Sequence, residues 1–287
     1  MNMGNVFITV WDYLGKAILS TFTQLFILFF PLLLLAFLMN YISLLNENLS
    51  LKVMGKNLYL YLFGWLGTSV HELGHALFAL VFGHKIKEIK LFKPDTKSGT
   101  LGYVNHTYNP KNVYHLIGNF FIGIGPLLIC TLLLYFLSFL LFKINFFTIS
   151  NIHFSTDTMK SFALLKHEGN NIWNVLTVFT TDVFHGKSST WWKIVILIYC
   201  LYSIGSSITL STSDVKTSVK GFLIIVAIIF VFNLVTIWEG DFAIGWLTKA
   251  NPFLSGIYSI MILALVVNLL FVVIISIILM GKYLLKE

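Results

Sequence analysis

The sequence predicts an all-α polytopic membrane protein, organised as one integral membrane domain over residues 1–287 with its core in residues 57–238. Hydrophobic residues make up 57% of the chain and charged residues 11%, whereas a soluble globular domain carries about 25% charged residues. The mean hydropathy is +0.85. Residues 17–46 contain no charge, and a run of that length can cross the hydrocarbon core of a bilayer.

Apolar runs predict about six transmembrane helices. The first is too long to be the apolar core of a signal peptide, so we expect it to be retained. The third contains Gly123-Ile124-Gly125-Pro126, and a kink or break is expected there because proline lacks a backbone donor. The expected spans are 18–40, 57–82, 113–142, 192–210, 218–238 and 254–281.

Two segments between these spans have other patterns. Ile86–Phe92 and Thr100–Tyr108 predict a short membrane-associated β-hairpin after the second span, around a turn at residues 94–99. Ser155–Lys166 and Ile172–Phe184 predict interfacial amphipathic helices between the third and fourth spans. The expected interfacial anchors are Trp173, Trp191 and Trp192.

The basic residues are all lysines, 19 in number, and the chain has no arginine. No arginine-bearing basic face is present, so nucleic acid is not an expected partner. The lysines instead indicate membrane topology and contact with anionic lipid. We expect a multi-pass protein of a cell membrane, with both termini on the lysine-rich cytoplasmic side. Abundant Lys, Asn, Ile and Phe without Arg indicates an AT-rich bacterial genome. Cys130 and Cys200 lie in apolar runs, where no disulfide is expected.

The motif His71-Glu72-Leu73-Gly74-His75 lies within the second span. Residues four apart share a helix face, so both imidazoles can bind one Zn²⁺ while Glu72 acts as general base toward a water. The alternative is two interfacial histidines beside a glutamate that reaches toward water. Ionisable groups are costly inside a membrane segment, however, and this favours a metal site. Small residues share the stripe of the histidines and predict that it faces other helices: Gly64, Gly67, Thr68 and Gly74.

Asp214 is the expected third metal ligand. It lies in the turn between the fourth and fifth spans, on the predicted cytoplasmic side. His75 lies about 12 Å below that surface at 1.5 Å per residue. Asp214 is also placed to cap the following helix, because Ser211-Thr212-Ser213-Asp214 suits a helix start. His106 is the main rival ligand.

Other acidic and imidazole groups are less suitable as ligands. His84 and His115 lie on the same predicted side as the motif. The opposite side holds Glu239, Asp241, Asp182 and His185, which topology therefore disfavours.

The motif in a span, Gly125-Pro126 in the next span and the lone Asp214 after the fourth resemble the site-2 protease family of intramembrane zinc metalloproteases. The likeness covers residues 57–235. In that family the acid lies in Asn-Pro-Asp-Gly or Leu-Asp-Gly, whereas here it lies in Ser213-Asp214-Val215. The resemblance implies that the hairpin binds extended substrate by strand addition.

The expected activity is therefore hydrolysis of peptide bonds in or near transmembrane segments. Zn²⁺ is the cofactor, and membrane-spanning proteins or peptides in the bilayer are the substrates. The alternative is a non-hydrolytic zinc protein: a transporter, a sensor or a peptide-binding scaffold. The other span interiors offer few amides for an ion path, among them Asn233 and Asn268.

Overall fold

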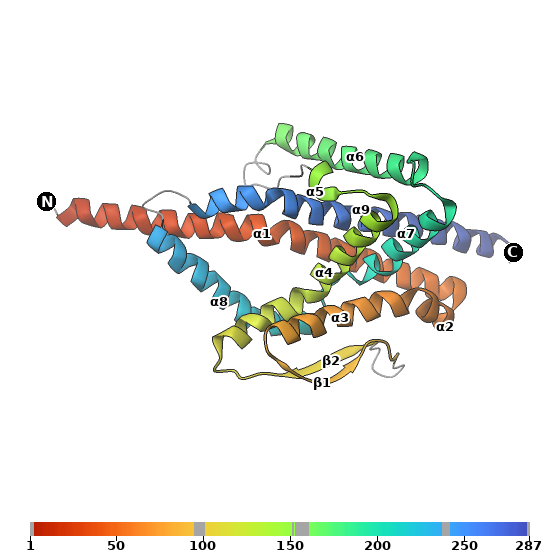
Figure 1. Ribbon diagram of the computed structural model, residues 1–287, viewed down its shortest axis with the longest axis horizontal. Coiled ribbons are helices and arrows are strands. Elements are labelled where there is room, and N and C mark those ends of the chain that lie inside the picture. Colours follow the sequence, from red (N-terminus) through yellow and green to blue (C-terminus); the bar gives the residue numbers. More distant parts are fainter. Residues whose placement is uncertain (1–2, 95–100, 151, 153–160, 237–241, 286–287) are drawn as a thin grey trace.

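The computed structural model describes residues 3–94, 101–150, 152, 161–236 and 242–285. The described chain is almost entirely helical, with one two-stranded sheet below the helices (Figure 1). Four of its helices are long and apolar enough to cross a membrane: Val10–Met54, Val113–Phe142, Thr212–Thr236 and Lys249–Lys282. This confirms a helical membrane protein. A count of six spans stays a prediction.

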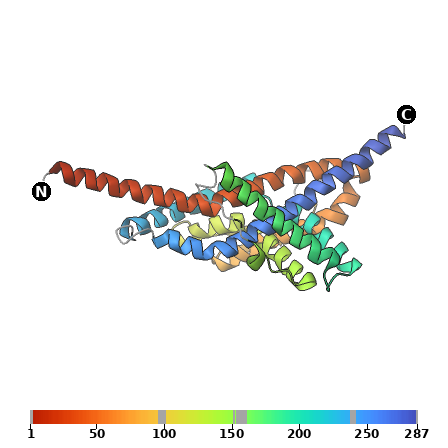
Figure 2. The same cartoon turned by 90° about the horizontal axis from the view of Figure 1, so that it is seen from above.

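The two longest helices, α1 (Met3–Met54) and α9 (Phe242–Leu284), lie side by side and run in the same direction (Figures 1 and 2). The Asn46 amide on α1 donates to the Asn268 carbonyl oxygen on α9 at 3.0 Å. Together with α4 (Val113–Phe142) and α7 (Trp191–Ser203) they bury the apolar core. This core includes Leu127, Leu134, Leu197, Leu201, Tyr258 and Ala264.

The helix that carries the motif begins as α2 (Lys56–Tyr59), passes through a π-helical turn η1 (Leu60–Gly64) and continues as α3 (Trp65–Val81). It packs against α4 (Val113–Phe142). A Cβ on Gly74 would lie 2.6 Å from the Pro126 Cα, so the two backbones touch at this crossing. The α4 helix continues through Pro126, so it does not break there.

The predicted hairpin is confirmed with shorter strands, β1 (Lys85–Lys90) and β2 (Tyr103–Thr107), paired antiparallel. The hairpin lies beneath α3 (Figure 1). Its register places Ile86 opposite His106, with an irregularity between Ile86 and Glu88. Residues 95–100 of the expected turn lie outside the described residues.

The segment after α4 differs from expectation. A short helix α5 (Phe146–Ile149) is followed by one long helix α6 (Phe162–His185). The prediction of two separate helices was therefore wrong for residues 162–184, while residues 155–160 lie outside the described part. Glu168 and Asn171 are in the expected break, but the Asn171 amide donates to the Glu168 carboxylate at 3.3 Å within the continuous helix.

The sequence led us to expect Asp214 in a hairpin turn between the fourth and fifth spans. Within the described residues 161–236, the structure has no such hairpin at Asp214. The helix α7 (Trp191–Ser203) leads through a 3-10 turn η3 (Gly205–Ser207) to α8 (Thr212–Thr236). In Figure 1, α7 lies to the right of this junction and α8 runs to the left of it, so the chain continues onward. The termini lie at opposite ends of the molecule (Figure 1), and their location on the cytoplasmic side stays a prediction.

Candidate metal centre

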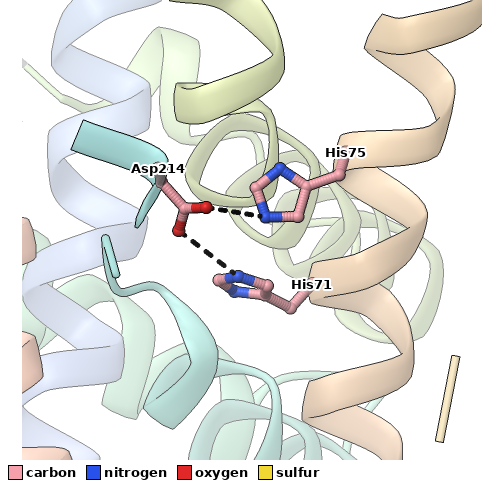
Figure 3. Close-up of side chains that lie close together, drawn as sticks. All are labelled: His71, His75 and Asp214. Carbon is pink, nitrogen blue, oxygen red and sulfur yellow. Dashed lines mark ion pairs between the residues drawn. The ribbon is translucent and has the colours of Figure 1, made fainter. Parts of the chain in front are cut away.

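Three side chains from two distant segments meet at one point. His71 and His75 project from α3 toward Asp214 in the first turn of α8 (Figure 3). The His75 Nε2 lies 3.4 Å from Asp214 Oδ1, and the His71 Nε2 lies 4.0 Å from Asp214 Oδ2. These side chains are 12–14% exposed. The predicted trio is therefore brought together in space.

The spacing of these atoms suits a small divalent cation. Ligand atoms of all three residues lie within 4.8 Å of one another. Donors held about 2.0–2.1 Å from a tetrahedral zinc ion lie about 3.3 Å apart. The 3.4 Å separation fits this edge, and the 4.0 Å separation needs only a small inward movement of one side chain.

The other nitrogen of each ring sets its tautomer. The His71 Nδ1 lies 2.9 Å from the Ser207 carbonyl oxygen, and the His75 Nδ1 lies 2.8 Å from the Ile122 carbonyl oxygen. A carbonyl oxygen only accepts, so each Nδ1 carries the proton and donates it. Each Nε2 then presents a lone pair toward Asp214, the arrangement that metal-binding histidines require.

Proline creates one of these acceptors. In an α-helix the N–H of residue 126 would donate to the carbonyl of residue 122, but Pro126 has no N–H. The Ile122 carbonyl is thereby left for His75. Pro126 also contacts Gly74 next to His75, so one residue brings the helices together and supplies the free acceptor.

Asp214 caps a helix and also faces the two histidines. The Ser211 N–H donates to Asp214 Oδ2 at 2.8 Å, and the Asp214 N–H donates to Ser211 Oγ at 3.1 Å. This reciprocal pair is a capping box at the start of α8. Oδ1 is turned toward His75. The helix cap therefore orients the carboxylate toward the histidines.

Two residues of the predicted stripe, Gly67 and Gly74, lie at helix contacts, whereas a Cβ on Gly64 would meet only Leu60 of the same helical segment. A Cβ on Gly67 would overlap the Ser203 carbonyl oxygen and the Ser207 hydroxyl. One on Gly74 would overlap α4. These contacts bring the Ser207 and Ile122 carbonyls within reach of the two rings, and they confirm that the histidine face points into the bundle.

Glu72 is buried and lines a cavity of about 440 Å³ together with the three metal-site side chains. Gly102, just before β2, lies directly against it. A Cβ on Gly102 would stand 2.8 Å from the Glu72 Cγ and 2.8 Å from the Leu91 carbonyl oxygen. No feature of the sequence indicates this contact, because a glycine after a turn has many structural explanations.

His106, the rival ligand, is not one of the three converging side chains. Its Nδ1 lies 3.0 Å from the His84 Nδ1, and the His84 Nε2 donates to the His115 carbonyl oxygen at 3.0 Å. His84 therefore accepts at Nδ1 and His106 donates. Burial lowers the pKa of both rings, so the neutral forms are favoured. His106 lines the cavity but is not grouped with the trio among the described residues.

The other candidates are not at the centre. Asp182 and His185 are in the last turn of α6 and do not line the cavity. Glu239 and Asp241 lie outside the described residues. His115 accepts from the Asn109 N–H at 3.1 Å. Cys130 and Cys200 are free and buried.

Imidazole and carboxylate donors with a neighbouring glutamate make this a centre that can bind a cation and move a proton beside it. Comparisons of the chain with protein-family models, with curated proteins and with solved structures find no match.

Proposed function

We propose that this protein is an intramembrane zinc metalloprotease that hydrolyses peptide bonds in or near transmembrane segments. One observation supports this proposal most. The Nε2 atoms of His71 and His75 and the carboxylate of Asp214, which is held by the Ser211 N–H, converge beside the buried Glu72. Three protein ligands with a fourth position open is the donor arrangement of catalytic zinc.

Zinc held by His71, His75 and Asp214 would lower the pKa of a water and polarise the peptide carbonyl. Glu72 takes the proton from the attacking water and returns it to the leaving amine. Because Gly102 has no Cβ, it leaves space for the Glu72 side chain. The Ser207 and Ile122 carbonyls keep the rings oriented during this cycle.

An extended substrate fits along β2. The cavity is lined by six consecutive residues, 101–106. Side chains alternate between the two faces of a strand, so a cavity on one face would contact only every second residue. Because consecutive residues line this cavity, it follows the edge of the strand. In the described sheet β2 pairs only with β1. Its other edge is available for a substrate strand, and a membrane helix that unwinds there exchanges its internal hydrogen bonds for these.

A non-hydrolytic zinc transporter is less well supported. Its ion path would need polar groups leading from the centre through the bundle. Instead, the Asn233 amide donates to Thr21 Oγ1 at 2.8 Å, and Asn268 is paired with Asn46 on α1. These amides hold helices together, and neither lines the cavity of the metal centre.

The test compares Glu72→Gln with the native protein at matched zinc content. We expect zinc to be retained and cleavage of a leucine-rich membrane-spanning test peptide to fall by about a thousandfold or more, since general-base catalysis is worth 10²–10⁴. Glu88→Gln is the matched control, because Glu88 is an exposed residue of β1 outside the cavity. Equal cleavage by both variants would contradict the proposal.

A further inference from the structure

We propose that a second cavity beside the metal centre is a subsite for a carboxylate of the substrate, and this rests on the proposed proteolytic function. The cavity has a volume of about 430 Å³ and lies between β2 and the start of α8. Its polar lining comes from Asn105, His106, Tyr108, Lys216, Thr217 and Lys220.

The charge of this cavity is positive. Lys216 and Lys220 are four residues apart on α8 and therefore share a face of the helix. Neither forms an ion pair within the part of the chain that the structure describes. No described lining residue is acidic, and the carboxylate of nearby Asp214 is directed to Ser211 and His75. The start of α8 adds the positive end of its helix dipole.

The subsite is continuous with the catalytic cavity. The two cavities share Val104, Asn105, His106 and Thr217. A peptide that follows the edge of β2 through the metal centre therefore passes the two lysines.

The hairpin side of the subsite is held in place by ring contacts. Tyr108 stacks on His84 with ring centroids 5.0 Å apart, and His106 bonds to the same His84. His84 is buried and anchored to α4 through the His115 carbonyl. The polar groups facing the lysines are therefore ordered before substrate arrives, which reduces the entropy cost of binding.

The position along the substrate follows from the strand. Gly102 lies against Glu72, whereas the polar residues that the hairpin side contributes to the subsite are Asn105, His106 and Tyr108. Three to six residues at about 3.3 Å each place the carboxylate about 10–20 Å from the general base. An acidic residue three to six positions from the cleaved bond, on one side only, is the substrate feature that this geometry selects.

A lipid headgroup is a less suitable occupant. Val215 and Val219, two of the apolar side chains that α8 exposes, line a different and mainly apolar cavity with residues of α1 and α4. The lysines instead share their cavity with the substrate strand's path.

The experiment uses leucine-rich membrane-spanning peptides in which one glutamate is scanned through the flank of the cleaved bond. Each is paired with a glutamine peptide, and cleavage by the full-length zinc-loaded protein is measured in neutral detergent. We expect kcat/KM to favour glutamate by about fivefold or more at positions three to six on one side. Lys216→Gln/Lys220→Gln should abolish this preference, and Lys216→Glu/Lys220→Glu should reverse it in favour of a lysine peptide. Lys187→Gln is the control, because Lys187 is an exposed lysine just after α6 that lines neither cavity.

Binding is measured separately with the Glu72→Gln protein by fluorescence anisotropy of the same peptides, and the glutamate preference should weaken with added salt. Equal kcat/KM for glutamate and glutamine at every position would overturn the subsite. So would lysine-dependent cleavage that responds only to anionic lipid and not to the peptide. If no peptide is cleaved in a Glu72-dependent manner, the proposed function itself fails, and binding then decides the subsite alone.

Discussion

Nδ1 of His75 donates to the carbonyl oxygen of Ile122 at 2.8 Å. That carbonyl lies four residues before Pro126, so no helix N–H competes for it. The orientation of a proposed zinc ligand thus depends on a proline in a neighbouring helix.

Pro126→Ala should weaken zinc binding by about tenfold, the lower end of effects seen for partners of metal ligands. The new N–H at residue 126 would compete with His75 for the Ile122 carbonyl. Zinc affinity is measured by competition with a fluorescent chelator. Pro252→Ala, in the interior of α9, is the control and should leave the affinity unchanged. Equal affinities for the two variants would show that Pro126 has no such role.

Asp214→Asn separates the cap from the ligand. Asparagine still accepts the Ser211 N–H, so α8 should keep its start, while the lost negative charge should lower zinc affinity by about a hundredfold. Ser211→Ala should do the opposite: it removes the hydroxyl bonded to the Asp214 N–H and costs about 1 kcal/mol of stability. Zinc titration and thermal unfolding of both variants measure the two effects. A lower unfolding temperature in Asp214→Asn, with zinc affinity unchanged, would assign Asp214 to capping alone.

Gly102→Ala should reduce cleavage by about 10- to 100-fold without releasing zinc, since a displacement of about 1 Å at a reacting group has costs of this order. The added Cβ would press on the Glu72 Cγ and on the Leu91 carbonyl. Gly169→Ala on α6 is the control, because a Cβ there meets nothing within 4 Å. Unchanged cleavage by Gly102→Ala would mean that Glu72 is not held by this contact.

Acid should loosen the hairpin from α4. The folded pKa values of His84 and His106 lie below the ordinary 6.5 because of burial, so the unfolded chain binds more protons as the pH falls below 6.5. Stability from this pair is therefore full above that pH and is lost below it. Amide hydrogen exchange of β1 and β2, corrected for intrinsic rates, should rise between about pH 7 and pH 5. The slope should disappear in His84→Gln/His106→Gln. A pH-independent hairpin in the native protein would contradict this coupling.

The motif's helix, the hairpin and the meeting of Asp214 with the histidines were predictable, because periodicity, turn residues and the cost of ionisable groups in apolar runs all appear in the sequence. The direction of the chain from α7 to α8, which carries Asp214, was not predictable. Two apolar runs joined by a short polar stretch are compatible both with a hairpin and with a chain that continues in one direction. Only the packing of the helices distinguishes the two. The split of α6 was wrong because local turn residues such as Gly169 and Asn170 are tolerated inside a packed helix.

The hydrogen-bond partners of the His71 and His75 rings were also not predictable. Both partners are backbone carbonyls, which every residue has, so no sequence motif marks them. The exception is Ile122. A proline in a helix always frees the carbonyl four residues earlier, so Pro126 does identify this acceptor once α4 is known to run unbroken. The Ser207 carbonyl follows from the 3-10 turn, which no motif predicts.

X-ray absorption at the zinc edge, with zinc content measured on the purified full-length protein, tests the central claim most directly. We predict one zinc per chain, bound by two imidazole nitrogens and one carboxylate oxygen at about 2.0–2.2 Å, and loss of that zinc in His71→Ala/His75→Ala. A protein that binds no zinc, or that keeps an equal amount without both histidines, would contradict the assignment.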